Sequence, residues 1–315
     1  TFGIFAAGYV VRPLGGMVMA HFGDLLGRKK MFNLSILLMA VPTLLIGLLP
    51  TYASIGLAAP LLLLLLRVCQ GAAVGGEVPG AWVFVSEHVP ARHIGYACGT
   101  LTAGLTFGIL LGSLVATGIN SVFTPQQVLD YGWRLPFLLG GIFGLGAMYL
   151  RRWLHETPVF LELQQRKALA AEMPLKAVLR QHRRAVVLSM LLTWMLSAAI
   201  VVVILMTPAL LQKVYGFDAR TALTANALAT LCLAIGCVAF GVLADRLGAR
   251  RMLIAGALLL AVCTYVFYTT LKTRPDLLLP LYALLGLSVG VVGVVPSAMV
   301  RAFPAPVRFS GLSFS

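Results

Sequence analysis

GDLLGRKK at residues 23–30 and ADRLGARR at residues 244–251 are two copies of one short pattern. Each copy has a glycine three residues after an aspartate, followed by basic residues, and each stands between two long apolar segments. A glycine permits a tight reversal of the chain, and an aspartate can cap a helix or pair with an arginine. The repeat therefore predicts two similar helical halves, each with a charged turn between two helices.

The composition of the chain is that of a protein embedded in a lipid bilayer. Of its 315 residues, 60% are hydrophobic and only 11% are charged, whereas an ordinary soluble domain has about 25% charged residues. The net charge is +14, but the basic residues stand between apolar stretches instead of forming one solvated face, which argues against nucleic-acid binding. The five cysteines and five histidines have no metal-ligand spacing, so we expect no metal, no cofactor and no enzyme activity.

Apolar segments long enough to cross a bilayer as helices, about 20 residues each, recur along the whole chain. Their continuous apolar character excludes a strand barrel. We expect an all-α membrane protein with about nine transmembrane helices, at residues 2–22, 31–49, 56–85, 95–119, 134–150, 185–208, 221–243, 252–271 and 277–300.

The longest polar segment, residues 151–184, divides these predicted spans into two groups. It predicts one bundle over residues 1–150, a cytoplasmic linker over 151–184 and a second bundle over 185–315, as in transporters built from repeated halves. Seventeen Lys and Arg residues, including those of both turns, lie in one alternate set of connections and five lie in the other. The positive-inside rule places the first set in the cytoplasm. Because neither end carries a polar terminus, we interpret the chain as a truncated piece of a longer transporter.

Arg12, Arg67 and Glu77 lie inside predicted spans. An ionisable side chain at the bilayer centre costs roughly 2.5–3.5 kcal/mol, so each is a functional candidate. On one helix Arg67 and Gln70 share a stripe with Glu77 at its edge, about 15 Å from Arg67, which excludes a direct bridge between the two charges. They are either buried groups paired with other helices or a polar lining, in which Arg67 binds an anion or tunes a proton carrier and Glu77 carries the coupling proton.

The substrate cavity has further candidates in both halves. Arg12, beside Pro13, either lines the cavity with Gln70 or satisfies a carbonyl freed near the proline. In the second half Thr193, Trp194 and Asn226 are polar candidates for the opposite wall, although each can equally be a packing residue. Pairs of glycines four residues apart allow close helix packing; they are Gly71 with Gly75, Gly76 with Gly80, and the series Gly104, Gly108 and Gly112.

The two turns suggest a cytoplasmic gate held by charged contacts, although their basic residues can also serve only as a topology signal. Glu87, at the cytoplasmic end of the third predicted span, is a candidate partner for Arg28 of the first turn. The predicted gate residues are Asp24, Gly27, Arg28, Glu87, Asp245, Arg246, Gly248 and Arg250.

The runs DLLGRK (24–29) and DRLGAR (245–250) resemble the loop signature of the major facilitator superfamily and its second-half copy, with departures at Ala20 and Ala249. Within that superfamily the chain resembles the metabolite:proton symporters. The motifs that carry this resemblance are GYVVRPLGG (8–16), RVCQG (67–71), GGE (75–77), YGWRLPF (131–137) and ETPVF (156–160). The resemblance implies a two-bundle transporter of twelve spans, of which this chain would hold spans two to ten and the start of eleven. It also implies a monomer in the bacterial inner membrane.

The resemblance further implies a proton-coupled symporter of a small polar metabolite, either an organic acid anion or a zwitterionic osmolyte, that works by alternating access. It links Arg67 to proton coupling, with H⁺ as the coupling ion. The alternative is a proton-linked efflux antiporter of an amphiphilic compound. Gly95, Gly104, Gly108 and Gly112 match the glycine spacing of an antiporter motif, but Ile109 stands where that motif has proline, which favours symport.

Overall fold

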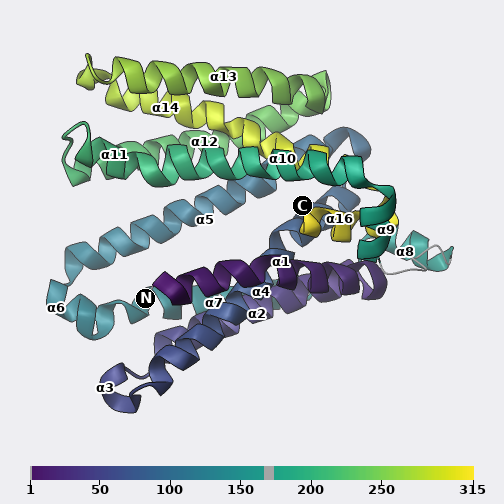
Figure 1. The fold of residues 1–315 in the computed structure, drawn as a ribbon, viewed down its shortest axis with the longest axis horizontal. Helices are drawn as coiled ribbons and strands as arrows, with labels where there is room; N and C mark the ends of the chain where they lie inside the picture. Colours follow the sequence, from purple (N-terminus) through teal and green to yellow (C-terminus); the bar gives the residue numbers. More distant parts are fainter. Residues whose placement is uncertain (1, 167–173) are drawn as a thin grey trace. The chain divides into compact units, whose positions relative to one another are not determined.

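The computed structural model describes residues 2–166 and 174–315, which form helices and short connections without any strand (Figure 1). Seven helices in these ranges are long and apolar enough to cross a membrane, or eight if the bent pair Pro125–Gly132 and Arg134–Arg151 is one span. Helix α1 (Phe2–Leu26) covers the first predicted span but is not one of the seven. The all-helical membrane fold is confirmed. With the bent pair counted as one span, α1 accounts for the difference between eight spans and the nine predicted.

The chain forms two compact units. The first comprises residues 1–87, 112–186 and 303–315, and the second comprises residues 88–111 and 187–302. Helix α5 (Ile94–Val122) contributes residues to both units. The predicted division of the sequence into a bundle over residues 1–150, a linker over 151–184 and a bundle over 185–315 stays a prediction.

The first unit is built around α1, α2 and α4. Helix α2 (Arg28–Leu48) packs along α7 (Arg134–Arg151) and also contacts α1, which in turn contacts α16 (Arg308–Phe314). The remaining helices of the unit are α3 (Tyr52–Ile55), α4 (Ala58–His88), α6 (Pro125–Gln127), α8 (Pro158–Gln165) and α9 (Pro174–Gln181).

Glycines bring α1 and α4 into backbone contact. A Cβ atom at Gly71 would collide with the carbonyl oxygen of Gly8, and one at Gly75 would collide with the carbonyl oxygen of Arg12. The helices therefore approach as closely as the glycine spacing predicts. In contrast, Gly104, Gly108 and Gly112 of α5 have no described atom within 4 Å of a Cβ position, so the close seam suggested by their spacing stays a prediction.

The second unit packs α12 (Ala219–Leu247) against α14 (Leu278–Val289) and α13 (Ala249–Thr270), as the upper part of Figure 1 shows. Its core contains buried Leu233, Phe267, Tyr282 and Leu285. The other elements are α10 (Arg183–Ile200), which begins in the first unit, a π-helical segment Val201–Met206, α11 (Thr207–Lys213) and α15 (Val295–Ala302).

Candidate functional site

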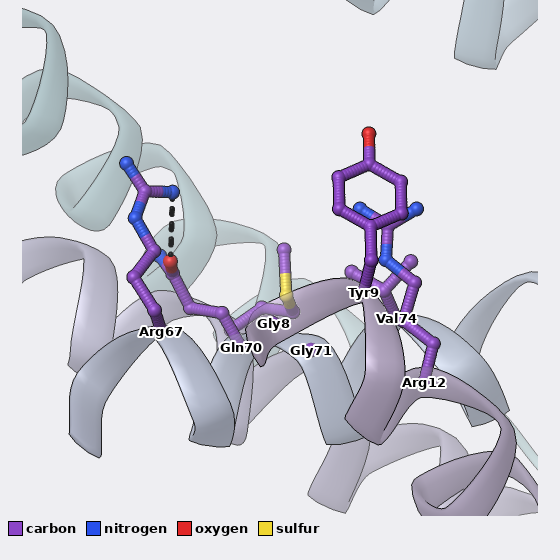
Figure 2. Close-up of a pocket in the computed structure, with 8 residues that line it drawn as sticks. Gly8, Tyr9, Arg12, Arg67, Gln70, Gly71 and Val74 are labelled. Carbon is purple, nitrogen blue, oxygen red and sulfur yellow. Dashed lines mark hydrogen bonds between the residues drawn. The ribbon is translucent and has the colours of Figure 1, made fainter. Parts of the chain in front are cut away.

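A cavity of about 160 Å³ lies in the first unit, between α1, α2 and α4 (Figure 2). It is lined by Gly8, Tyr9, Arg12, Met39, Arg67, Gln70, Gly71 and Val74. The glycine contacts between α1 and α4 bring the two arginines to the same cavity from different helices. Of the predicted site residues, the structure thus brings together Arg12, Arg67 and Gln70.

Arg67 is oriented by a chain of hydrogen bonds that crosses from α4 to α2. Its Nη1 donates to Oε1 of Gln70 at 3.2 Å, and Nε2 of Gln70 donates to Oγ1 of Thr43 at 2.7 Å. The Thr43 hydroxyl donates in turn to the carbonyl oxygen of Met39 at 2.6 Å. The guanidinium carbon of Arg67 lies 5.8 Å from the ring centroid of Phe137. Gln70 is therefore a positioning residue for the arginine.

Arg12 lines the cavity from α1. Its guanidinium carbon lies 3.8 Å from the ring centroid of Tyr9, and its buried Nε has no hydrogen-bond partner among the described residues. None of the eight lining residues is acidic, and neither Arg12 nor Arg67 forms an ion pair with any described residue. The cavity therefore holds two positive charges with no negative charge in its lining, an arrangement suited to an anion.

Glu77 lies outside this cavity and pairs with Arg151 at the end of α7. The distance from Glu77 Oε1 to Arg151 Nη2 is 3.5 Å, and both side chains are 22% exposed. The Arg151 guanidinium also stacks on the Phe32 ring, at 3.7 Å from its centroid, and donates to the Phe32 carbonyl oxygen. The absence of a bridge between Arg67 and Glu77 agrees with the sequence analysis. Arg151 as a partner was missed, because the sequence presents it only as one of many basic linker residues.

The first turn carries a buried charge network. Arg28, only 2% exposed, places Nε 2.8 Å from Oε2 of Glu87 and Nη2 3.5 Å from Oδ1 of Asp24. Its Nη2 also donates to the carbonyl oxygen of Ala305 at 2.7 Å. The structure therefore brings together Asp24, Arg28 and Glu87, which the sequence analysis grouped as one gate.

Two further residues complete this network. Arg308 places Nη1 3.0 Å from Oε1 of Glu87, and the Thr157 hydroxyl donates to the other oxygen of Glu87 at 2.7 Å. Asp24 accepts a hydrogen bond of 2.9 Å from the backbone N–H of Ser310, near the beginning of α16. Neither Arg308 nor Thr157 was predicted to belong to the gate. Thr157 stands within the motif ETPVF (156–160), but the partners of both residues depend on the tertiary fold.

Gly27 has φ of 117°, which only glycine adopts without strain, and it separates α1 from α2. The Glu156 carboxylate lies against it and accepts hydrogen bonds from the backbone N–H of Lys29, at 3.1 and 3.2 Å. Because the first N–H groups of a helix lack partners within the helix, Glu156 caps α2.

The second turn uses its aspartate differently. Asp245 accepts hydrogen bonds from the backbone N–H groups of Gly95 at 2.8 Å and Tyr96 at 2.7 Å, at the beginning of α5. Arg301 places Nη2 3.2 Å from Asp245 Oδ1. Gly248 has φ of 94° and ends α12. Arg246 and Arg250 are exposed and form no ion pair with a described residue, so the partner of Asp245 is Arg301.

The predicted residues of the second half are not gathered in one pocket. Thr193 lies 3.7 Å from the sulfur of Met299, and Trp194 is 74% exposed. Asn226 Oδ1 lies 2.6 Å from the hydroxyl of buried Tyr282, which is also 2.7 Å from the carbonyl oxygen of Val203 in the π-helical segment. Asn226 thus belongs to a buried polar cluster, in which Tyr282 provides the partner that the π-helical backbone needs.

Spanning helices, a repeated charged turn and a cavity lined by two arginines are features of a membrane transporter. Comparison with known proteins agrees: the family model described as Major Facilitator Superfamily matches residues 1–314. The chain belongs to the Major Facilitator Superfamily, and the predicted family is confirmed. It is a multi-pass membrane protein and not an enzyme.

The chain is similar to curated bacterial transporters. It is 32% identical to the shikimate transporter of Escherichia coli (strain K12), a match that covers 99% of this chain and 72% of the relative. It is also 32% identical to the citrate-proton symporter of Klebsiella pneumoniae, over 100% of this chain and 71% of the relative. Among solved structures, the proton:xylose symporter XylE bound to 6-bromo-6-deoxy-D-glucose matches with a TM-score of 0.80 at 17% identity, covering 99% of this chain and 74% of that one. The XylE likeness supports the fold.

Proposed function

We propose that this protein is a proton-coupled symporter of a small organic acid anion, working by alternating access in the inner membrane of a bacterium. Two of its relatives, the shikimate transporter and the citrate-proton symporter, support organic acids as the substrate class. The observation that carries it is the cavity of the first unit, where Arg12 and Arg67 face the same space without an acidic neighbour in the lining.

The chemistry of the cavity favours a carboxylate. An arginine presents a planar set of donors that matches the two oxygens of a carboxylate, and such charge-assisted hydrogen bonds strengthen in a medium of low dielectric constant. The Gln70–Thr43 chain holds the Arg67 guanidinium in place, and Arg12 approaches from the other helix. A carboxylate bound between them would provide the negative charge that the lining lacks.

Glu77 is the carboxyl that we assign to the coupling proton. Its pairing with Arg151 at 3.5 Å joins α4 to the end of α7. Protonation of Glu77 removes the charge that attracts Arg151, so it weakens a contact between two helices. A carboxyl in this position can therefore link the binding of a proton to a change in helix packing.

The test is uptake of labelled shikimate and citrate by proteoliposomes that contain the full-length transporter, with an inward proton gradient and with or without a protonophore. We expect accumulation that the protonophore abolishes. Arg67→Gln removes a charged donor worth about 1.5–3 kcal/mol and should lower uptake about 10-fold to 100-fold. Glu77→Gln should abolish gradient-driven accumulation while counterflow exchange remains.

The matched control is Arg166→Gln, which removes an exposed arginine paired with Glu162 and should leave uptake unchanged. Gradient-driven accumulation that survives Glu77→Gln would remove this residue from the coupling role. Transport outward against an inward proton gradient would replace the symporter by the efflux antiporter.

A further inference from the structure

A patch of basic side chains at the junction of α9 and α10 stands apart from the cavity and from both turns. It consists of Lys176, Arg180, Arg183 and Arg184, all exposed, and we call it the junction patch. None of the four forms an ion pair with a described residue. The patch therefore gathers four positive charges that have no counter-charge among residues 2–166 and 174–315.

The helix beneath the patch is fixed to the first unit. Helix α9 contacts α1, α16 and the 3₁₀ turn Ala305–Val307, and its Val178 is fully buried. The backbone N–H of His182 donates to the Val178 carbonyl oxygen, and that of Val186 donates to the His182 carbonyl oxygen. These two hydrogen bonds link the end of α9 to the beginning of α10. The basic residues therefore stand on ordered helices that are packed against the first unit.

Apolar and basic side chains alternate on this surface. Leu175, Lys176, Leu179, Arg180 and Arg183 line an open hollow of about 410 Å³, and a neighbouring hollow of about 440 Å³ is lined by residues 180–185. At about 100° per residue, Leu175 and Leu179 form one side of a continuous strip on the helix surface, and Lys176 and Arg180 form the other side. Such a surface suits a ligand that has both an anionic head and an apolar body.

The position of the patch in the chain selects the ligand. Arg183 is the first residue of a helix that is long and apolar enough to span the membrane, Arg183–Lys213. The charges therefore stand where that span leaves the bilayer, on the side that the positive-inside rule assigns to the cytoplasm.

We propose that the junction patch binds the phosphate headgroup of an anionic phospholipid of the cytoplasmic leaflet. Arg180 and Arg183 donate to the phosphate oxygens, Lys176 adds a third positive charge, and Leu175 and Leu179 contact the upper part of an acyl chain. Basic pockets at the ends of membrane helices favour such headgroups, since arginine matches the geometry of phosphate and the membrane surface concentrates the ligand.

The test measures retention of labelled phosphatidylglycerol by the full chain in detergent micelles, with labelled phosphatidylcholine as the neutral lipid. We expect the triple variant Lys176→Gln, Arg180→Gln, Arg183→Gln to lose about 100-fold in affinity for phosphatidylglycerol, with phosphatidylcholine retention unchanged. Added salt should weaken binding to the unaltered protein much more than binding to the variant.

The matched control removes the same number of charges from exposed residues in the opposite set of connections, as Lys213→Gln, Arg220→Gln and Lys272→Gln. It should retain phosphatidylglycerol like the unaltered protein. An equal loss in both triple variants would assign the effect to net charge and overturn the site, as would an unchanged affinity in the junction variant.

A milder pair of variants keeps the proposal testable if the triple variant does not fold. Arg180→Gln should lower the affinity about 5-fold, and Arg180→Lys, which keeps the charge but not the planar donor pair, should restore part of it. Displacement of the lipid by inorganic phosphate alone, at equal concentration, would show a site for a free anion and would overturn the lipid assignment.

Discussion

The two turns, residues 23–30 and 244–251, share a sequence pattern but hold their aspartates in different surroundings. In the first turn Asp24 is 1% exposed and its partner is Arg28 of the same turn, which also reaches Glu87. In the second turn the partner of Asp245 is Arg301, which lies far away in the sequence. The Arg301 side chain is 38% exposed. A motif copied in sequence thus fixes the position of an acid, while the tertiary fold decides how deeply its charges are buried.

Both aspartates nevertheless serve the same purpose. Asp24 accepts from the backbone near the beginning of α16, and Asp245 accepts from the first residues of α5. The beginning of a helix carries unpaired N–H groups and a partial positive charge. The shared element of the repeat is therefore an acid that caps another helix, and the different element is the arginine beside it.

The largest expected effect comes from breaking the buried network of the first turn. Glu87→Gln leaves the buried Arg28 guanidinium without its nearest carboxylate, and the Arg308 contact is lost as well. Removing one partner of a buried pair costs about 3–5 kcal/mol, so the free energy of unfolding should fall by about that amount. Denaturant or thermal unfolding in detergent measures it.

The control for this change is Glu162→Gln, which breaks the exposed pair with Arg166 and should cost about 0.5 kcal/mol or less. A similar loss in the two variants would mean that the Glu87 network is no stronger than a surface pair.

An intermediate effect separates the two glycines. Gly27→Ala forces an alanine to φ of 117° and places its Cβ about 2.5 Å from the Glu156 carboxylate, whereas Gly248→Ala meets no described atom within 4 Å. Backbone strain costs about 1–3 kcal/mol in each case. Because only the Gly27 variant adds the close contact with Glu156, Gly27→Ala should be the more destabilising. Unfolding of the two variants under identical conditions checks the order, and the reverse order would contradict the structure.

The smallest effect is expected at Arg301. Because its side chain is partly exposed, Arg301→Gln should lower the free energy of unfolding by about 0–1 kcal/mol. The backbone hydrogen bonds from Gly95 and Tyr96 to Asp245 should survive, and hydrogen exchange at these two amides measures whether they do. A large rise in exchange at both amides would show that Arg301 is needed to hold the cap.

The sequence predicted the helical membrane fold, the family and the residues that gather around the first turn. The long apolar segments and the repeated Asp–Gly spacing are local patterns, and local patterns determine helices and turns. It also placed Arg67 and Gln70 on one face of a helix, where the structure joins them by a hydrogen bond.

The sequence did not predict the partners that come from distant segments. Arg151 pairs with Glu77, Arg301 with Asp245, and Arg308 with Glu87. Each pair depends on how far one helix is shifted along another, and the residue spacing within a single segment does not determine that shift. The glycines of α5 show the converse, because a spacing suited to close packing has no described neighbour at Gly104, Gly108 or Gly112.

The chain of hydrogen bonds that joins Thr43, Gln70 and Arg67 affects how a substrate is recognised. A free arginine side chain samples many rotamers, and fixing it costs about 2 kcal/mol of conformational entropy. In this protein much of that ordering takes place when the chain folds, before any anion arrives. The guanidinium is thus preorganised, so an arriving carboxylate meets an oriented donor pair and loses less affinity to the freezing of a flexible side chain.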